Sequence, residues 1–306
     1  MSTQPEAHAS ATHAVRPGLA YLLAAVAMVI YSSPPAVTRA VTGAVPPLAL
    51  SLSRWVIAFV ILLPFALRPL ARDWHRIRGR IWPLVGLVLP MIIGSTMSVL
   101  AVYYTTATNA VLVNASQPAV TAGLGWLIAG TILSGRQKLG IACAFTGIVV
   151  MIVQADLNRL LTFQINVGDF IMLLAVVGWS LYAVLLNRVE DVPRGALLMF
   201  LISIIGMLVL LPLATLEYVF RGGFAFTQPV VGAMFFLAIF PTILATVAWN
   251  AAIRSVGANR TAIFVNLIPV SGAALAVAFL GESLYPYHLI GAAFVIVGIF
   301  LAVRRR

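Results

Sequence analysis

The sequence predicts an all-α membrane protein of ten transmembrane helices, arranged as two inverted five-helix repeats. Three observations predict this fold: the composition, ten long apolar stretches, and an internal repeat with a shift of 151 residues. Of the 306 residues, 62% are hydrophobic and 9% are charged, whereas soluble domains are about half apolar and a quarter charged. Because so few polar residues cannot cover a soluble surface, a bilayer is the solvent that suits this chain.

Each predicted helix is an apolar stretch long enough to cross about 30 Å of hydrocarbon, which takes roughly 20 residues. The sequence lacks the alternating pattern of membrane β-strands, so helices are the remaining way to satisfy the backbone inside a bilayer. The ten stretches lie near residues 18–38, 47–67, 82–103, 109–132, 138–154, 168–187, 195–216, 230–251, 258–280 and 286–303.

The basic residues between these stretches predict the orientation of the chain. With the N-terminus in the cytosol, fifteen of the nineteen basic residues fall in cytosolic segments and only Arg39, Arg159 and Arg221 fall outside. This asymmetry follows the positive-inside rule. It predicts a multi-pass protein of the bacterial inner membrane with a cytosolic tail at 1–16 and both termini in the cytoplasm. It also accounts for the net charge of +11 without nucleic acid as a partner.

The repeat appears when the chain is shifted by 151 residues, because prolines and glycines with backbone roles then coincide. The halves span residues 17–155 and 166–303, and five helices in each half place the second upside down relative to the first. Inverted repeats are a recurrent plan of secondary transporters, with a binding site between the repeats near the midplane. The coinciding pairs are Pro90 with Pro241, Pro118 with Pro269, Gly130 with Gly281, Gly140 with Gly291, and Gly147 with Gly298.

Five local stretches carry a family resemblance: 258–269, Leu280-Gly281-Glu282-Ser283-Leu284, 289–292, Gly168-Asp169 and Gly178-Trp179-Ser180-Leu181-Tyr182. They resemble the drug/metabolite transporter superfamily in its EamA-type branch, and the resemblance covers about residues 17 to 305. Arg54 lies where such proteins often carry an arginine in the second helix. Two stretches depart from the family pattern: Gly130-Thr131 replaces a Gly-Glu pair, and Ile30-Tyr31-Ser32 replaces a Trp-Gly pair. The resemblance implies a ten-helix exporter or exchanger of metabolites such as amino acids.

Arg54 is the one basic residue in the interior of an apolar stretch, where a charge is costly unless it has a partner. Two interpretations stay open for it: a binding or gating cation, or a structural arginine that snorkels or bonds helix carbonyls. Asp169 and Glu282 fall at the outer ends of helices, so no buried carboxylate relay for protons is visible. Glu282 is expected to tie a turn or pair with a cation.

Polar side chains follow single faces of several predicted helices. Asn114, Gln117 and Thr121 share one face of the fourth, at positions i, i+3 and i+7. We expect these faces to converge on a central substrate cavity, whereas the alternative is that each group bonds a neighbouring helix. The predicted substrate-binding residues are Tyr31, Ser32, Arg54, Ser95, Ser98, Asn114, Gln117, Trp179, Tyr182, Thr246, Trp249, Asn250 and Asn266.

Pro118 and Pro269 are expected to be hinges beside this cavity, because a proline inside a helix frees backbone carbonyls; the alternative is a simple packing kink. Gly140, Gly147, Gly291 and Gly298 recur at seven-residue spacing. These glycines predict close packing of the fifth and tenth helices, and leave open a contact with another subunit in a homodimer.

The sequence carries no pattern of a catalytic or metal site. Its single cysteine is Cys143, its four histidines fall in predicted tails and loops, and no HExxH motif or helical carboxylate pair occurs. No cofactor, metal or catalytic residue is therefore expected. The predicted partners are the lipid bilayer and a small-molecule substrate. The predicted function is secondary transport of small polar or amphipathic metabolites, in the direction of export and by alternating access. The alternatives are a channel-like facilitator and, less favoured, an intramembrane enzyme.

Overall fold

The computed structural model describes residues 17–130, 134–154, 166–186, 193, 195–256, 264 and 267–303. This part of the chain is almost entirely helical and contains no β-strand beyond an isolated bridge between Thr42 and Val45. The helices of the first half are α1 (Pro17–Ser32), α2 (Pro34–Ala40), α3 (Pro47–Arg78), α4 (Ile81–Val102), α5 (Ala107–Asn114), α6 (Gln117–Ala129) and α7 (Gly135–Ile152). Those of the second half are α9 (Val167–Leu186), α10 (Ala196–Arg221), α11 (Gln228–Leu237), the π-helix η1 (Ala238–Ala245), α12 (Thr246–Val256), α14 (Leu267–Leu280) and α15 (Pro286–Val303).

Each of the ten predicted stretches contains helix. Within the described residues, six helices are long and apolar enough to cross a membrane, and the pair α5–α6, bent by 41°, would make a seventh. Three shorter apolar helices lie at Lys138–Met151, Leu267–Leu280 and Pro286–Gly298. The all-α membrane fold is therefore confirmed, while the number of ten membrane crossings stays a prediction.

Prolines account for the breaks in these helices, because a proline has no N–H and its ring collides with the preceding turn. Pro34 opens α2 directly after the break that ends α1, and Pro118 lies in the first turn of α6 after the break that ends α5. Pro269 likewise lies in the first turn of α14. Both predicted hinge prolines thus occupy helix starts, and whether they move during function stays a prediction.

The repeat-related Pro90 and Pro241 have different effects on their helices. Pro90 lies inside the uninterrupted helix α4, whereas Pro241 lies inside the π-helix η1. The wider π-turn accommodates the missing donor. The Thr242 hydroxyl donates to the Leu237 carbonyl five residues earlier, at 2.9 Å. The sequence predicted a plain helix over 230–251, so this π-helix is a correction.

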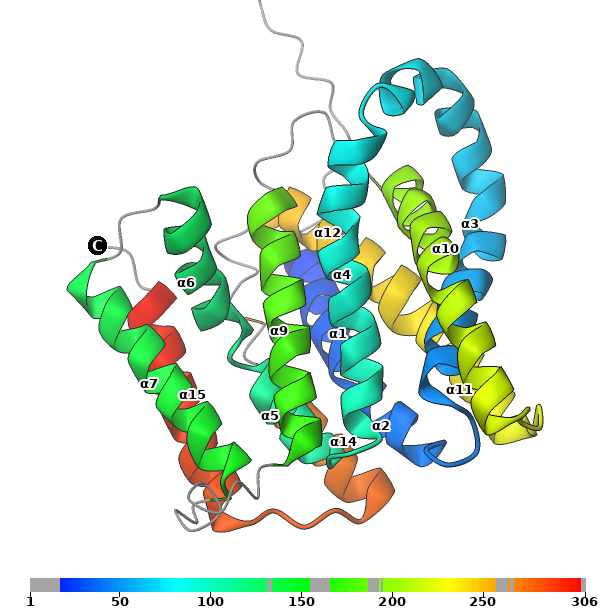
Figure 1. Cartoon of the computed structure of the whole chain (residues 1–306). Helices are drawn as coiled ribbons and strands as arrows, with labels where there is room; N and C mark the ends of the chain where they lie inside the picture. The colour runs from blue at the N-terminus through cyan, green and yellow to red at the C-terminus, as the bar shows by residue number, and fades with distance from the viewer. Residues whose placement is uncertain are drawn as a thin grey trace, which may run out of the picture.

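The two halves pack as an inverted pair (Figure 1). The extensive contacts join α3 to α10, α7 to α15, α4 to α9, and α1 to α12. When the two halves are exchanged, the pairs α3–α10 and α7–α15 each map onto themselves, whereas α4–α9 maps onto α1–α12. The pairs are antiparallel: the start of α3 meets the end of α10, where Leu48 donates its N–H to Glu217 at 2.9 Å. The described helices therefore follow the predicted inversion.

Glycines at the crossing of α7 and α15 allow the backbones of these two helices to approach each other closely. A Cβ added at Gly147 would lie 2.5 Å from the Gly291 carbonyl oxygen, and one at Gly298 would lie 2.5 Å from the Gly140 carbonyl oxygen. The 151-residue shift converts the first contact into the second. The predicted close packing of these helices is confirmed within one chain, and a homodimer stays a prediction.

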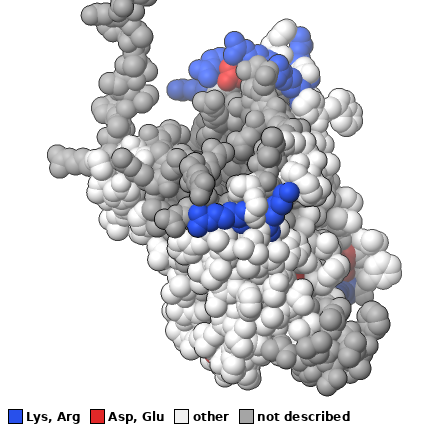
Figure 2. All heavy atoms as spheres, turned by 90° about the vertical axis from the view of Figure 1, so that its left-hand side faces the viewer, with Lys and Arg blue, Asp and Glu red and all other residues white. Residues whose placement is uncertain are grey.

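Basic side chains gather at one end of the molecule (Figure 2), over the end of α3 and the start of α4. Arg68, Arg72, Arg76, Arg78 and Arg80 are all exposed there. Large apolar side chains are exposed along the helix flanks, including Leu127 on α6, Phe220 on α10 and Phe300 on α15. An apolar flank below a basic end is the surface that a bilayer-embedded protein requires.

We expect Gly147→Ala to destabilise the protein by about 1–3 kcal/mol, because the added methyl group would overpack the crossing with α15. Gly86→Ala is the matched control, since nothing lies within 4 Å of a Cβ at Gly86 in α4. The measurement is thermal unfolding of both purified variants in detergent. Equal melting temperatures for the two variants would contradict the close α7–α15 crossing.

Candidate functional site

Two polar contacts join the halves where predicted site residues meet. Between α1 and α12, the Tyr31 hydroxyl lies 2.9 Å from the Thr246 hydroxyl. Between α4 and α9, the Trp179 indole N–H donates to the Ser98 hydroxyl at 3.4 Å. These helix pairs are exchanged by the repeat, and the 151-residue shift superposes Tyr31 on Tyr182 and Ser95 on Thr246. The predicted residues therefore meet in two symmetry-related places.

A third group of contacts lies around the break between α5 and α6. The Ser180 hydroxyl on α9 donates to the Gln117 carbonyl at 3.3 Å, and the Thr121 hydroxyl donates to the same carbonyl at 2.8 Å. The buried side-chain oxygen of Asn114 has no hydrogen-bond partner in the described part of the chain. The break thus leaves polar groups at membrane depth, as discontinuous helices do at transporter sites.

The other predicted site residues lie in surroundings that range from polar to apolar. Ser32 accepts a hydrogen bond from Ser271 on α14 at 2.9 Å, and Ser95 is buried in α4. Trp249 packs in an apolar cluster with Met28 and Ala245. Tyr182 packs against the apolar cluster formed by α3, α4 and α10. The side chain of Asn250 and the whole of Asn266 lie outside the described residues.

Arg54 is buried in the first third of α3, with 8% of its surface exposed. Its Nη2 donates to the Thr242 hydroxyl of η1 at 3.5 Å, and its guanidinium carbon lies 5.9 Å from the centre of the Trp55 ring. The Nε atom has no partner among the described residues. The π-helix thus faces the one basic residue that the sequence places in the interior of an apolar stretch.

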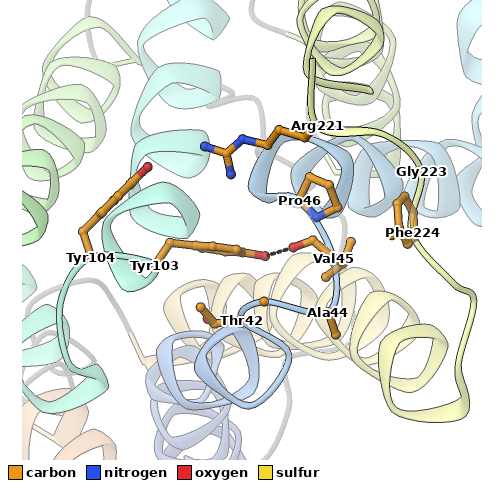
Figure 3. A pocket seen from close by; sticks show the side chains of 10 residues that line it. Thr42, Ala44, Val45, Pro46, Tyr103, Tyr104, Arg221, Gly223 and Phe224 are labelled. Carbon is orange, nitrogen blue, oxygen red and sulfur yellow. Dashed lines mark hydrogen bonds between the residues drawn. The ribbon is translucent and has the colours of Figure 1, made fainter. Parts of the chain in front are cut away.

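A hollow of about 410 Å³ lies at the end of the bundle that the loop charges assign to the outside (Figure 3). Its wall combines the turn from Thr42 to Pro46 with Tyr103, Tyr104 and Arg221. The Tyr103 hydroxyl donates to the Val45 carbonyl at 2.6 Å, while the Arg221 side chain reaches over the opening. The sequence did not predict this hollow, although the predicted outer position that Arg221 shares with the turn at 42–46 was a signal for it.

The same end of the bundle holds a buried polar network that sequence analysis also missed. The Asn109 amide nitrogen donates to Asp169 at 3.0 Å, and the Thr105 hydroxyl donates to the other Asp169 oxygen. His288 accepts the Tyr285 N–H on Nδ1 at 3.0 Å, so its Nε2 carries the proton and donates to the Asn109 oxygen at 2.7 Å. His288 was expected in a loop, but it is 2% exposed within α15.

Two carboxylates at this end cap helices of the other half. Glu282 accepts the N–H groups of Ala107 and Thr108 at 2.8 and 2.9 Å, and so caps α5. Glu217 accepts those of Leu48 and Ala49 at 2.9 and 3.1 Å, and so caps α3. A carboxylate is stabilising at a helix N-terminus because the free N–H groups and the helix dipole favour negative charge. Glu282 was expected to tie a turn or pair with a cation, whereas its carboxylate caps a helix of the other half.

We expect Asn109→Ala to cost about 1–3 kcal/mol for each buried group that it leaves unpaired, namely the His288 N–H and one Asp169 oxygen. Thr215→Val is the control, because the exposed Thr215 hydroxyl bonds only its own helix, at the Leu211 carbonyl. Thermal unfolding in detergent measures both effects. A melting temperature for Asn109→Ala within error of the control would show that the network contributes nothing to stability.

The EamA-like transporter family model matches this chain twice, over residues 18–153 and 166–304. The uncharacterized transporter YyaM of Bacillus subtilis is 32% identical over 201 residues, which are 65% of this chain and 65% of that relative. The uncharacterized transporter YetK of the same organism is 25% identical over 94% of this chain and 87% of its own.

A probable amino-acid metabolite efflux pump of Salmonella typhimurium is 28% identical over 63% of this chain and 66% of its own. A crystal structure of 19% identity superposes with a TM-score of 0.60, over 92% of this chain and 96% of the other. At that identity the superposition supports the fold alone.

Proposed function

Because this chain belongs to the EamA-like transporter family, we propose that it is a secondary transporter that exports small polar or amphipathic metabolites across the inner membrane. The family and the apolar helices identify the chain as a multi-pass membrane transporter rather than an enzyme. Direction, solute and mechanism are the proposed part. The observation that supports the mechanism is the pair of polar contacts that join the inverted halves, Tyr31 with Thr246 and Trp179 with Ser98.

These contacts suit alternating access, in which one repeat rocks against the other around a fixed site. Both are between neutral groups, so opening either one exposes no unpaired charge and costs about 0.5–1.5 kcal/mol. Since the repeat exchanges the two helix pairs, opening one and then the other would expose the site to the two sides of the membrane in turn. The outer hollow beside Arg221 is the proposed mouth on the outer side.

Aromatic rings next to hydroxyl and amide groups suit a solute with both apolar and polar parts. The Salmonella relative named as a probable amino-acid metabolite efflux pump makes amino acids the first solutes to test. Purified protein in liposomes should show saturable flux and counterflow with at least one amino acid, nucleoside, sugar or organic cation, with or without a proton gradient. Single-channel currents without counterflow would instead identify the channel-like facilitator.

We expect Trp179→Ala, Gln117→Ala and Asn250→Ala each to lower the initial rate of this flux by about tenfold, because each removes a proposed contact with the solute. Trp82→Ala is the control for Trp179, since Trp82 is 83% exposed at the start of α4. The comparison requires equal expression and unchanged elution in size-exclusion chromatography. Wild-type flux in all three variants would contradict the proposed central site.

The proposed topology has both termini in the cytoplasm of a bacterium. Reporter fusions after Arg80 should then report the cytosol, and fusions after Arg159 should report the outside, because the basic segments stay on the cytosolic side. Paired reporters, one active only in each compartment, measure this in intact cells. The opposite pattern would reverse the orientation, and the same compartment for both fusions would overturn the number of crossings.

A further inference from the structure

Arg54 stands in an environment that offsets its charge only in part, through the Trp55 ring 5.9 Å from the guanidinium carbon. It lies seven residues into α3, so its Cα is about 10 Å along the helix from the start. At that depth a cation is costly unless an anion or several acceptors surround it. A guanidinium has five N–H donors and no acceptor, yet Arg54 has one hydrogen bond among the described residues, at 3.5 Å to a hydroxyl.

Neither structural interpretation of this arginine agrees with its contacts. A snorkelling side chain would carry its guanidinium to the aqueous boundary, whereas 8% of Arg54 is exposed. A side chain bound to helix carbonyls would show those hydrogen bonds, and none joins Arg54 to a carbonyl within the described residues. The hydroxyl that it does reach, on Thr242, accepts one of its five N–H groups while donating to Leu237, and it carries no negative charge.

The carboxylates that the structure describes are all engaged elsewhere. Glu217 and Glu282 cap α3 and α5, Asp169 is bonded to Thr105 and Asn109, and Asp73 pairs with Arg72 at 3.1 Å. No carboxylate within the described ranges therefore faces Arg54. One turn earlier on the same helix face, the buried Ser51 hydroxyl also has no partner.

From these contacts we infer that Arg54 binds the carboxylate of the transported solute, which supplies the missing negative charge; this inference rests on the proposed transport function. The planar fork of a guanidinium matches the two oxygens of a carboxylate. One bound carboxylate would cancel one charge, since the sequence places no second basic residue in the interior of an apolar stretch. A phosphate monoester carries about two charges and would leave one uncancelled, so the predicted solutes are monocarboxylates, including zwitterionic amino acids.

The first test uses the wild-type protein in liposomes, and so needs no folded variant. Counterflow is measured with the twenty amino acids, and the best solute is then compared with its own carboxamide and its phosphate-bearing analogue as competitors. We expect the carboxylate to compete about 10- to 100-fold better than either analogue, as the loss of a charge-assisted pair implies. Equal competition by the carboxamide, or better competition by the phosphate analogue, would overturn the inference.

The second test uses Arg54→Gln, with Arg76→Gln as the matched control on the exposed end of the same helix. Arg54→Gln should abolish the preference for the carboxylate, while Arg76→Gln should retain it. Arg54→Lys, which keeps the charge but loses the fork, should retain a smaller preference and serves if Arg54→Gln does not fold. A full preference in Arg54→Gln would overturn the inference.

The outcomes separate the two proposals. Flux of sugars, nucleosides or organic cations, without any carboxylate solute, would refute the role of Arg54 and leave the transporter intact. No flux with any solute, in protein that is folded by size-exclusion chromatography, would refute the proposed transport.

Discussion

The absence of water inside a bilayer is the constraint on which the rest of this structure depends. Backbone polar groups at depth must find their partners within the protein, and the chain achieves this with helices whose breaks are few and local. Where helices begin at the end predicted to face outside, the carboxylates of Glu217 and Glu282 cap N–H groups of the opposite half. These caps do more than satisfy donors, because each ties a helix start in the first repeat to a segment of the second.

Because the two halves are related by inverted symmetry, a contact between the halves can occur twice, once at each of two related positions. Gly147 meets Gly291 while Gly298 meets Gly140, so one seven-residue spacing produces both crossings of α7 with α15. The symmetry between the two halves is broken at two places, so the corresponding surfaces of the halves differ there. Trp55 fills the space beside Gly206, its own counterpart under the repeat, and Pro241 opens a π-helix where Pro90 does not. The π-helix then faces Arg54, which has no basic counterpart in the other half.

The sequence predicted the features that depend on local composition or on the repeat. Apolar stretches, loop charges and coinciding glycines locate the helices, the inversion and the close α7–α15 packing without knowledge of tertiary contacts. The network of Asn109, Asp169 and His288 was missed because it joins residues 60 and 179 positions apart, and no periodicity relates them. The π-helix was missed because Pro90 and Pro241 look alike in sequence. The predicted site residues meet in pairs, but their common cavity stays a prediction.

The buried side chains of Asp169 and Arg54 lie at different depths and differ in how many partners the protein gives them. This difference bears on function. Near the outer end, Asp169 is fully buried yet bonded to a hydroxyl and an amide, so its environment is complete without a ligand. Deeper in the bundle, Arg54 has a long bond to one hydroxyl and an unpaired Nε. Each carboxylate that the structure describes near the end that holds Asp169 has partners within the protein, as Glu217 does at the start of α3. An arginine left incomplete beside a π-helix is therefore best explained by a partner that arrives and leaves, as a transported solute does.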